Sequence, residues 1–234
     1  MRGILFDKDG TLLDFEATWT PVLKRLAREA AAGDPARAVA LLDAGGLDAA
    51  TGKFRAGSVI GAGTTRTIVA LWYPYLSGAG LAERVAAMDR AFLEHGGRHS
   101  VALAGVAATL DLLAGEGYVM GVATNDTTAA AKAALAGTGL LRHLPHVFGY
   151  DAVARAKPAP DMVHAFADAS GIPPAEIAVV GDNAHDLEMA RSAGAGLVVG
   201  VTSGNSAVAD LEPLADAMLP SVRELPAYLH QNRK

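Results

Sequence analysis

The chain has 234 residues and a mass of 23.9 kDa, enough for one large domain or for one main domain with a small inserted one. Hydrophobic residues make up 51% of it and charged residues 19%, so it can bury enough apolar surface to fold, which excludes an intrinsically disordered chain. With 20 Lys and Arg against 25 Asp and Glu, the formal net charge is −5. This leaves no basic excess to bind nucleic acid or an anionic membrane.

The chain contains no cysteine, which excludes disulfides, thiolate nucleophiles and zinc–thiolate sites, and fits a reducing cytoplasm. Its opening stretch is interrupted by Asp7, Lys8 and Asp9, so no signal-peptide apolar region can form there. No charge-free apolar run reaches the ~18 residues that a membrane span needs. We therefore expect a cytoplasmic protein.

The N-terminal part is predicted to be one strand followed by helices. Gly3–Phe6 is an apolar run that stops abruptly at Asp7, as a buried strand does when it leaves a sheet. From about Phe15 to His95 there is no strand-like alternation. Helices are predicted from Asp34-Pro35 to Gly45-Gly46, over Thr65–Tyr73, and over Leu81–Glu94, ending before Gly96-Gly97.

From Ala104 onward, predicted helices and strands alternate. The strands are expected at Tyr118–Thr124, His146–Tyr150, Ile177–Val180, Gly196–Val201 and Ala217–Leu219. The helices are expected from Ala104 to Gly115, from an Asn125-Asp126-Thr127 cap to Leu135, after Lys157-Pro158-Ala159-Pro160 to Ser170, over Leu187–Ala193 and over Ser221–His230. Such alternation predicts an α/β fold with a Rossmann-like parallel sheet covered on both faces. Residues 1–14 and 98–234 would form this core domain, and residues 15–97 an inserted α-helical cap domain.

In an open α/β sheet, ligands bind beyond the carboxyl ends of the strands, so the residues found there carry the most information. Here they are carboxylates, a hydroxyl, an amide and a lysine: Asp7, Asp9, Thr124, Asn125, Lys157, Asp182 and Asp186. Several carboxylates at one edge would repel one another without a cation, and an all-oxygen set suits a hard ion such as Mg²⁺. The sequence therefore predicts a metal site at this edge.

These residues lie in four segments: Asp7-Lys8-Asp9-Gly10-Thr11-Leu12, Ala123-Thr124-Asn125, Lys157-Pro158 and Gly181-Asp182-Asn183-Ala184-His185-Asp186. In order, spacing and place at strand ends, the segments resemble the four motifs of the haloacid dehalogenase superfamily. Within it the chain is most similar to the phosphoglycolate phosphatase type, which has an α-helical cap inserted after the first motif. The resemblance covers nearly the whole chain.

The resemblance implies how phosphate would be handled. Asp7 would be the nucleophile that takes the phosphoryl group as an aspartyl-phosphate. Asp9 would protonate the leaving oxygen and then deprotonate the water that hydrolyses the intermediate. The hydroxyl of Thr124, the amide of Asn125 at a helix N-terminus, and the ammonium group of Lys157 would hold the phosphoryl oxygens.

The resemblance also implies a metal site. Asp182 would bind Mg²⁺ together with Asp7 and the backbone carbonyl of Asp9. Asp186 would orient Lys157 or a metal-bound water. The neighbouring His185 is expected on the exposed surface of its helix.

The predicted function is that of a Mg²⁺-dependent phosphatase acting on a small phosphorylated metabolite, with phosphoglycolate-like substrates as the leading class. A sugar-phosphate mutase of the same fold would also keep Asp9 and stays open. A non-catalytic binding or regulatory protein would be expected to have lost Asp7, Asp9 or Lys157, and all three are present. A nicotinamide dehydrogenase is disfavoured because the glycine fingerprint is absent.

The sequence leaves the oligomeric state open between a monomer and a homodimer.

Substrate specificity would lie in the cap. The candidate positions there are Thr18, Trp19, Arg55, Ser58 and Thr64–Arg66. Arg55 and Arg66 are the candidates for contacting a substrate carboxylate, because a guanidinium can bind one bidentately.

Overall fold

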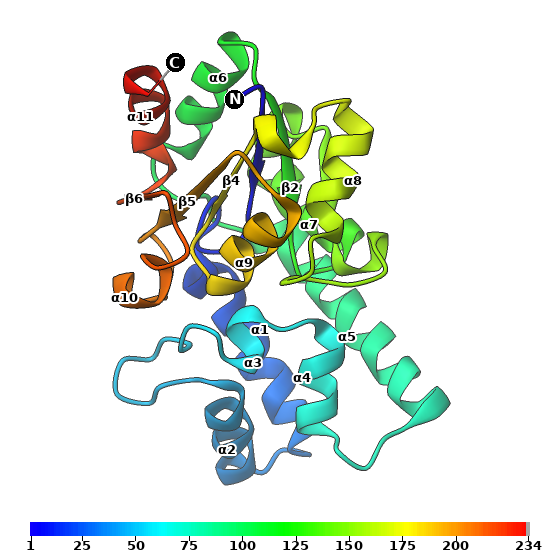
Figure 1. Ribbon diagram of the computed structural model, residues 1–234. Coiled ribbons are helices and arrows are strands. Elements are labelled where there is room, and N and C mark those ends of the chain that lie inside the picture. Colours follow the sequence, from blue (N-terminus) through cyan, green and yellow to red (C-terminus); the bar gives the residue numbers. More distant parts are fainter. Residues whose placement is uncertain (233–234) are drawn as a thin grey trace.

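A six-stranded sheet forms the centre of the computed structural model, which describes residues 1–232 (Figure 1). Its strands are β1 (Gly3–Phe6), β2 (Val119–Ala123), β3 (His146–Phe148), β4 (Ile177–Gly181), β5 (Leu197–Val201) and β6 (Ala217–Leu219). They lie in the order β3-β2-β1-β4-β5-β6, and every neighbouring pair is parallel. The predicted α/β fold with a parallel sheet is confirmed.

Helices cover both faces of this sheet, because successive residues of the central strands point to opposite sides. Ile4 and Phe6 of β1 belong to one apolar cluster, and Leu5 between them belongs to another. The first face packs against α6 (Val106–Gly115), α7 (Thr128–Gly137) and α11 (Leu225–Gln231). The second packs against α8 (Asp161–Ser170), α9 (Ala184–Ala193) and α10 (Val208–Leu211). Short 3-10 turns lie at Leu140–His143, Tyr150–Ala152, Pro174–Glu176 and Val222–Glu224.

The chain between β1 and α6 is a helical insertion with a core of its own. Its helices are α1 (Phe15–Ala30), α2 (Pro35–Gly45), α3 (Val59–Ala62), α4 (Thr65–Trp72) and α5 (Gly78–His99). Trp19, Leu23, Phe54, Trp72 and Phe92 are buried together there. In Figure 1 the insertion lies beyond the carboxyl ends of the strands. The predicted insertion after the first strand is confirmed, while its domain boundaries at residues 14/15 and 97/98 stay a prediction.

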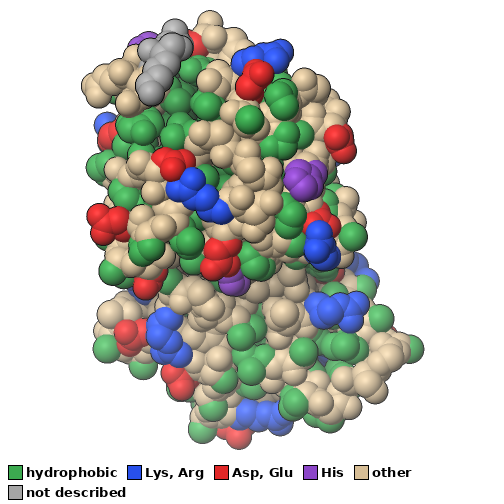
Figure 2. Space-filling model, viewed as in Figure 1, with side chains coloured by type: hydrophobic (Ala, Val, Ile, Leu, Met, Phe, Trp, Pro, Cys, Tyr) green, Lys and Arg blue, Asp and Glu red, His purple; other side chains and the backbone are tan. Residues whose placement is uncertain are grey.

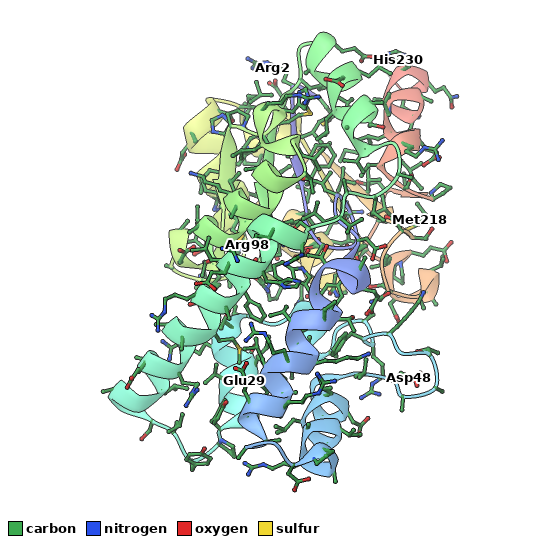
Figure 3. All side chains as sticks on the ribbon, turned by 180° about the vertical axis from the view of Figure 1, so that it is seen from behind. Arg2, Glu29, Asp48, Arg98, Met218 and His230 are labelled. Atoms are coloured by element: carbon green, nitrogen blue, oxygen red, sulfur yellow. The ribbon has the colours of Figure 1, made fainter. Side chains whose placement is uncertain are left out.

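Helix α5 continues past the end that the sequence predicts for it. Gly96 and Gly97 do not terminate the helix, which runs on to His99. A Cβ at Gly96 would lie 3.5 Å from the Cβ of Ala134 in α7, and a Cβ at Gly137 of α7 would lie 2.8 Å from the carbonyl oxygen of Gly97. The glycines therefore allow α5 and α7 to approach closely, and this packing outweighs their low helix propensity. Figure 3 shows Arg98, at this end of α5, beside the helices of the sheet.

Several further boundaries differ from the prediction, and three of them have a clear physical reason. Strand β3 ends at Phe148 rather than Tyr150, because a 3-10 turn begins at Tyr150. Helix α7 is capped by Thr127 alone, whose side chain accepts a hydrogen bond from the Ala130 N–H. Helix α9 begins at Ala184 rather than Leu187, because Asn183 and Asp186 form a capping box.

Charged side chains of both signs are scattered over the face seen in Figure 2, on the sheet part and on the insertion alike. Among the described residues, no helix is both long enough and apolar enough to cross a membrane.

Candidate active site

Asp7 and Asp182 lie side by side because they follow two adjacent parallel strands. The backbone N–H of Asp7 donates to the carbonyl of Val180 at 2.8 Å, which extends the pairing of β1 with β4 by one residue. Asp182 follows β4 directly, and its Oδ1 accepts a hydrogen bond from the Thr11 hydroxyl at 2.9 Å. The sheet register thus fixes both carboxylates at one edge.

Lys157 links Asp7 to Asp186. Its Nζ lies 2.6 Å from Asp7 Oδ1 and 2.6 Å from Asp186 Oδ1, and the lysine is 7% exposed. The other oxygen of Asp186 accepts from the backbone N–H of Asn183 at 3.0 Å. Burial alone would lower the pKa of Lys157, but the carboxylates of Asp186 and Asp7 outweigh it and raise this pKa above its ordinary value. Lys157 therefore stays a cation at neutral pH.

Carboxylate oxygens of Asp7, Asp182 and Asp186 all lie within 4.8 Å of one another. Burial, and then the charges of Asp7 and Asp186, raise the pKa of Asp182 well above its ordinary value, so the group lacks sufficient positive charge around it. A Cβ at Gly10 or Gly204 would occupy the space of the Asp182 carboxylate, so two glycines cradle this group. Oxygen donors in this arrangement fit Mg²⁺.

The three carboxylates differ in how many of their oxygens remain free to bind a metal. Both oxygens of Asp186 are used, one by Lys157 and one by Asn183. Asp7 has one oxygen on Lys157, and Asp182 has one on the Thr11 hydroxyl. The second oxygens of Asp7 and Asp182 are therefore the better metal ligands, and Asp186 is placed to hold Lys157.

Thr124 and Asn125 follow β2 at the same edge. The Thr124 Oγ1 accepts from the Asp126 N–H at 3.2 Å, which leaves its own O–H available as a donor. The side chain of Asn125 joins three segments: its Oδ1 accepts from the Lys157 N–H at 3.1 Å, and its Nδ2 donates to the Ala62 carbonyl of the insertion at 2.8 Å. Asn125 thus ties the loop of Lys157 to the insertion.

The carboxylate of Asp9 is held by two residues at once. Its Oδ1 accepts from the Trp19 indole N–H at 2.6 Å, and its Oδ2 pairs with the ammonium group of Lys8. Lys8 has no exposed surface, and its Nζ also lies 4.7 Å from the centre of the Trp19 ring. Asp9 is therefore fixed where the sheet edge meets α1 of the insertion.

Asp126 lies behind Asp9 and shares its lysine. The Asp126 Oδ2 lies 3.6 Å from Lys8 Nζ and has no hydrogen-bond partner within the described part of the chain. Burial raises the pKa of Asp126 to about 6, even though the nearby Lys8 charge lowers it. One buried lysine thus pairs with two half-buried carboxylates.

A cavity of about 100 Å³ joins these groups to the insertion. From the sheet side it is lined by Asp7, Asp9, Thr124, Asn125, Asp126, Lys157, Asp182, Asn183, His185 and Asp186. From the insertion it is lined by Phe15, Trp19, Leu23, Ile60, Gly61, Ala62, Gly63, Thr65, Ile68 and Phe92. Such a cavity admits only a small ligand.

Comparison with known proteins decides the family. Residues 1–194 match the haloacid dehalogenase-like hydrolases. The chain belongs to this family. A phosphoglycolate phosphatase of Rhodospirillum rubrum is 30% identical to this haloacid dehalogenase-like hydrolase over 202 residues, which cover 85% of the chain and 78% of the relative. A probable phosphatase IndB of Dickeya dadantii is 44% identical over 100 residues, a match that spans only 43% of either protein.

Solved structures show the same fold as this haloacid dehalogenase-like hydrolase. A hydrolase from Pseudomonas syringae superposes with a TM-score of 0.70 at 22% identity over the full length of both chains. A predicted phosphoglycolate phosphatase from Haemophilus somnus gives a TM-score of 0.73 at 21% identity over 97% of each chain.

The structure of this haloacid dehalogenase-like hydrolase brings together all seven residues that the sequence places at the sheet edge, since each lines the cavity. The two candidate arginines are elsewhere. Arg55 pairs with Asp43, whose carbonyl and carboxylate it contacts at 2.9 and 3.6 Å, and Arg66 is exposed. Neither arginine lines the cavity, whereas the candidate positions Trp19 and Thr65 do.

His185 differs from the prediction. It lines the cavity instead of lying on the exposed surface of α9, and its Nδ1 is buried with no hydrogen-bond partner in the described residues. Sequence reasoning also missed Lys8 and Asp126. Lys8 lies between two motif aspartates in the sequence. Its burial depends on the ring of Trp19, which comes from the insertion and packs against the Lys8–Asp9 ion pair.

Proposed function

We propose that this chain is a magnesium-dependent phosphatase that hydrolyses a small phosphomonoester through an aspartyl-phosphate on Asp7. The observation that supports this most is the arrangement around Asp7. Its carboxylate is paired with Lys157, lies beside Asp182, and shares a cavity with the separately held carboxylate of Asp9.

In the first step, an Asp7 oxygen attacks the phosphorus. A bond forms between that oxygen and phosphorus while the bond to the substrate alcohol breaks. Asp9 enters the cycle protonated and gives this proton to the departing oxygen, and the water of the second step returns a proton to it. Lys157, the Thr124 hydroxyl and the backbone N–H of Asn125 hold the other phosphoryl oxygens.

In the second step, water attacks the phosphorus of the aspartyl-phosphate. Asp9, now a carboxylate, takes a proton from the water, phosphate is released, and the Asp7 carboxylate is restored. Trp19 and Lys8 keep Asp9 in one position through both steps.

Asp7, Asp182 and the backbone carbonyl of Asp9 would hold the Mg²⁺, which would neutralise the charge of the phosphoryl group and of the attacking carboxylate. Asp186 acts through Lys157, because both of its oxygens are already used. It is a positioning residue.

The relatives named phosphoglycolate phosphatase make phosphoglycolate a natural first substrate to assay. A sugar-phosphate mutase must bind a second phosphate. The insertion side of the cavity presents no Lys or Arg among the described residues for such a group, so hydrolysis is the better-supported reaction.

The test is a panel of phosphomonoesters assayed for released phosphate with Mg²⁺, with EDTA, and with Mg²⁺ restored. We expect turnover that is lost with EDTA and recovered with Mg²⁺. Full turnover in metal-free protein would contradict the metal role, and conversion of a sugar phosphate to its isomer without phosphate release would favour the mutase.

A further inference from the structure

We infer that the substrate of this site is the phosphate ester of a small, uncharged alcohol with an apolar carbon skeleton, and that it carries no carboxylate. This inference rests on the proposed phosphatase function and specifies its substrate class. It comes from the insertion wall of the cavity, which we define as the ten lining residues of the insertion named above.

The insertion wall is almost entirely apolar. It presents Phe15, Leu23, Ile60, Ile68 and Phe92, together with the ring of Trp19. The Trp19 N–H is engaged by Asp9, and Thr65 contributes only a neutral hydroxyl. Of the two polar side-chain groups on this wall, the indole N–H is thus already used and the other carries no charge.

The wall also offers no positive charge to a substrate carboxylate. Lys157 is the one Lys or Arg among the described residues that line the cavity, and it already lies against Asp7 and Asp186. Five aspartates line the same cavity. A second anionic group would be desolvated beside these carboxylates with no further Lys or Arg of the described lining to pair with, which is costly. The Nδ1 of His185, unpaired within the described residues, belongs to the sheet side of the cavity and not to this wall.

The glycine loop of the insertion wall cannot supply a partner either. The backbone N–H of Gly61 donates to Ser58 Oγ, that of Ala62 to the Ser58 carbonyl, and that of Gly63 to the Val59 carbonyl. The Ala62 carbonyl accepts from Asn125. Backbone groups that are already paired cannot form the anion-binding nest that a glycine loop otherwise provides.

The site geometry directs the alcohol toward this wall. The phosphoryl group belongs over Asp7 and Lys157 on the sheet side, and Asp9 must reach the ester oxygen. Asp9 accepts a hydrogen bond from the Trp19 N–H at 2.6 Å. An ester oxygen within reach of Asp9 therefore places its attached carbon toward Trp19 and the apolar neighbours of Trp19. Apolar burial there favours an aliphatic group.

The experiment compares three esters of nearly the same shape: isobutyl phosphate, phosphoglycolate and the amide of phosphoglycolate. In isobutyl phosphate, two methyl groups replace the two carboxylate oxygens, and the amide is polar but uncharged. We measure kcat/KM with Mg²⁺ on the wild type. Dissociation constants are measured on Asp7→Asn, which holds the esters without turnover.

We expect kcat/KM for isobutyl phosphate to be at least tenfold higher than for phosphoglycolate, and its dissociation constant at least tenfold lower, with the amide between them in both measurements. Equal values, or a preference for phosphoglycolate or for the amide, overturn the inference. If the wild type hydrolyses none of the esters, the phosphatase proposal fails, and the binding order still decides the inference. Binding of none overturns it. If Asp7→Asn does not fold, competition of the three esters with 4-nitrophenyl phosphate on the wild type gives the same ranking.

A charge introduced into the wall provides a second readout. Phe15 is half-buried at the cavity, so Phe15→Lys places an ammonium group near the alcohol side. We expect the ratio of kcat/KM for phosphoglycolate to that for isobutyl phosphate to rise at least tenfold. The matched control is Val39→Lys on α2, 63% exposed and outside the cavity, which should leave the ratio unchanged. Equal shifts in the two variants would contradict the placement of the alcohol.

Discussion

The sheet side of the cavity carries five carboxylates and Lys157, whereas the insertion side carries aromatic and aliphatic side chains. On the sheet side the carboxylates of Asp7, Asp9 and Asp182 follow strand ends and are held by hydrogen-bond partners, such as Thr11 for Asp182. On the insertion side the same side chains that line the cavity also form the core of the insertion, as Trp19 and Phe92 do. The polar groups of the sheet side are thus positioned by hydrogen bonds, whereas the apolar side chains of the insertion side are positioned by packing in the core of the insertion.

The largest effect should come from removing the nucleophile on the sheet side. Asp7→Asn keeps the shape of the side chain but cannot attack phosphorus, so we expect kcat to fall by at least about 10⁴-fold with the fold retained. Asp168→Asn, an exposed aspartate on α8, is the control and should keep full activity. Residual activity near a tenth of the wild-type rate would exclude Asp7 as the nucleophile.

The next effect tests where the two sides meet. Asp9→Asn should slow phosphoryl transfer by roughly 10²–10⁴-fold for an alkyl phosphate, because the leaving oxygen then receives no proton. An aryl phosphate needs little protonation to depart, so its single-turnover phosphorylation step should slow much less. Equal losses for both esters would assign Asp9 another role.

The two sides also differ in how far the sequence predicts them. Asp7, Thr124, Lys157 and Asp182 could be found because parallel strands deliver their carboxyl ends to one edge, so position in the chain already implies proximity. No such rule applies to a helix, on which a residue that lines a cavity has the same periodicity as one that packs in the core. From the sequence, Trp19 is one of several possible cap positions. Arg55 is a candidate for contacting the substrate, but it pairs with Asp43 instead.

The buried pair at Lys8 could not be predicted for a related reason. A lone lysine after a strand normally extends into solvent, and burial requires partners from distant parts of the chain. Here the adjacent Asp9 is joined by two partners from distant parts of the chain, Asp126 and the ring of Trp19. The Lys8 ammonium group is buried only when the insertion has folded against it.

A smaller effect should follow from loosening Asp9 without removing it. Trp19→Phe keeps an aromatic ring in the cavity but deletes the hydrogen bond to Asp9, so we expect kcat to fall about tenfold. Trp72→Phe is the matched control, because Trp72 is buried in the same insertion and donates its N–H to the Leu41 carbonyl. It should lower stability without changing kcat. If both variants lose activity equally, the hydrogen bond to Asp9 has no special role.

The last effect is on stability rather than on activity, and it concerns Asp126. Burial raises its pKa from 3.8 to about 6, so its ionisation disfavours the folded state as pH rises from 4 to 6. Relative to Asp126→Asn, the wild type should therefore lose up to about 1.4 kcal/mol of unfolding free energy per pH unit in that window. Below pH 3.8 the difference between the two proteins should be constant. Urea unfolding across this range measures it, and parallel pH profiles would show that the carboxylate is not buried.

Helix α5 has a consequence for how the molecule comes apart. Val85, Met88 and Phe92 belong to the core of the insertion, while Gly96 and Gly97 of the same helix lie against α7 on the sheet. Melting the insertion would expose half of α5 and leave the other half without support. Loss of either region therefore destabilises the other, and heating should give a single cooperative transition in calorimetry rather than two separate ones.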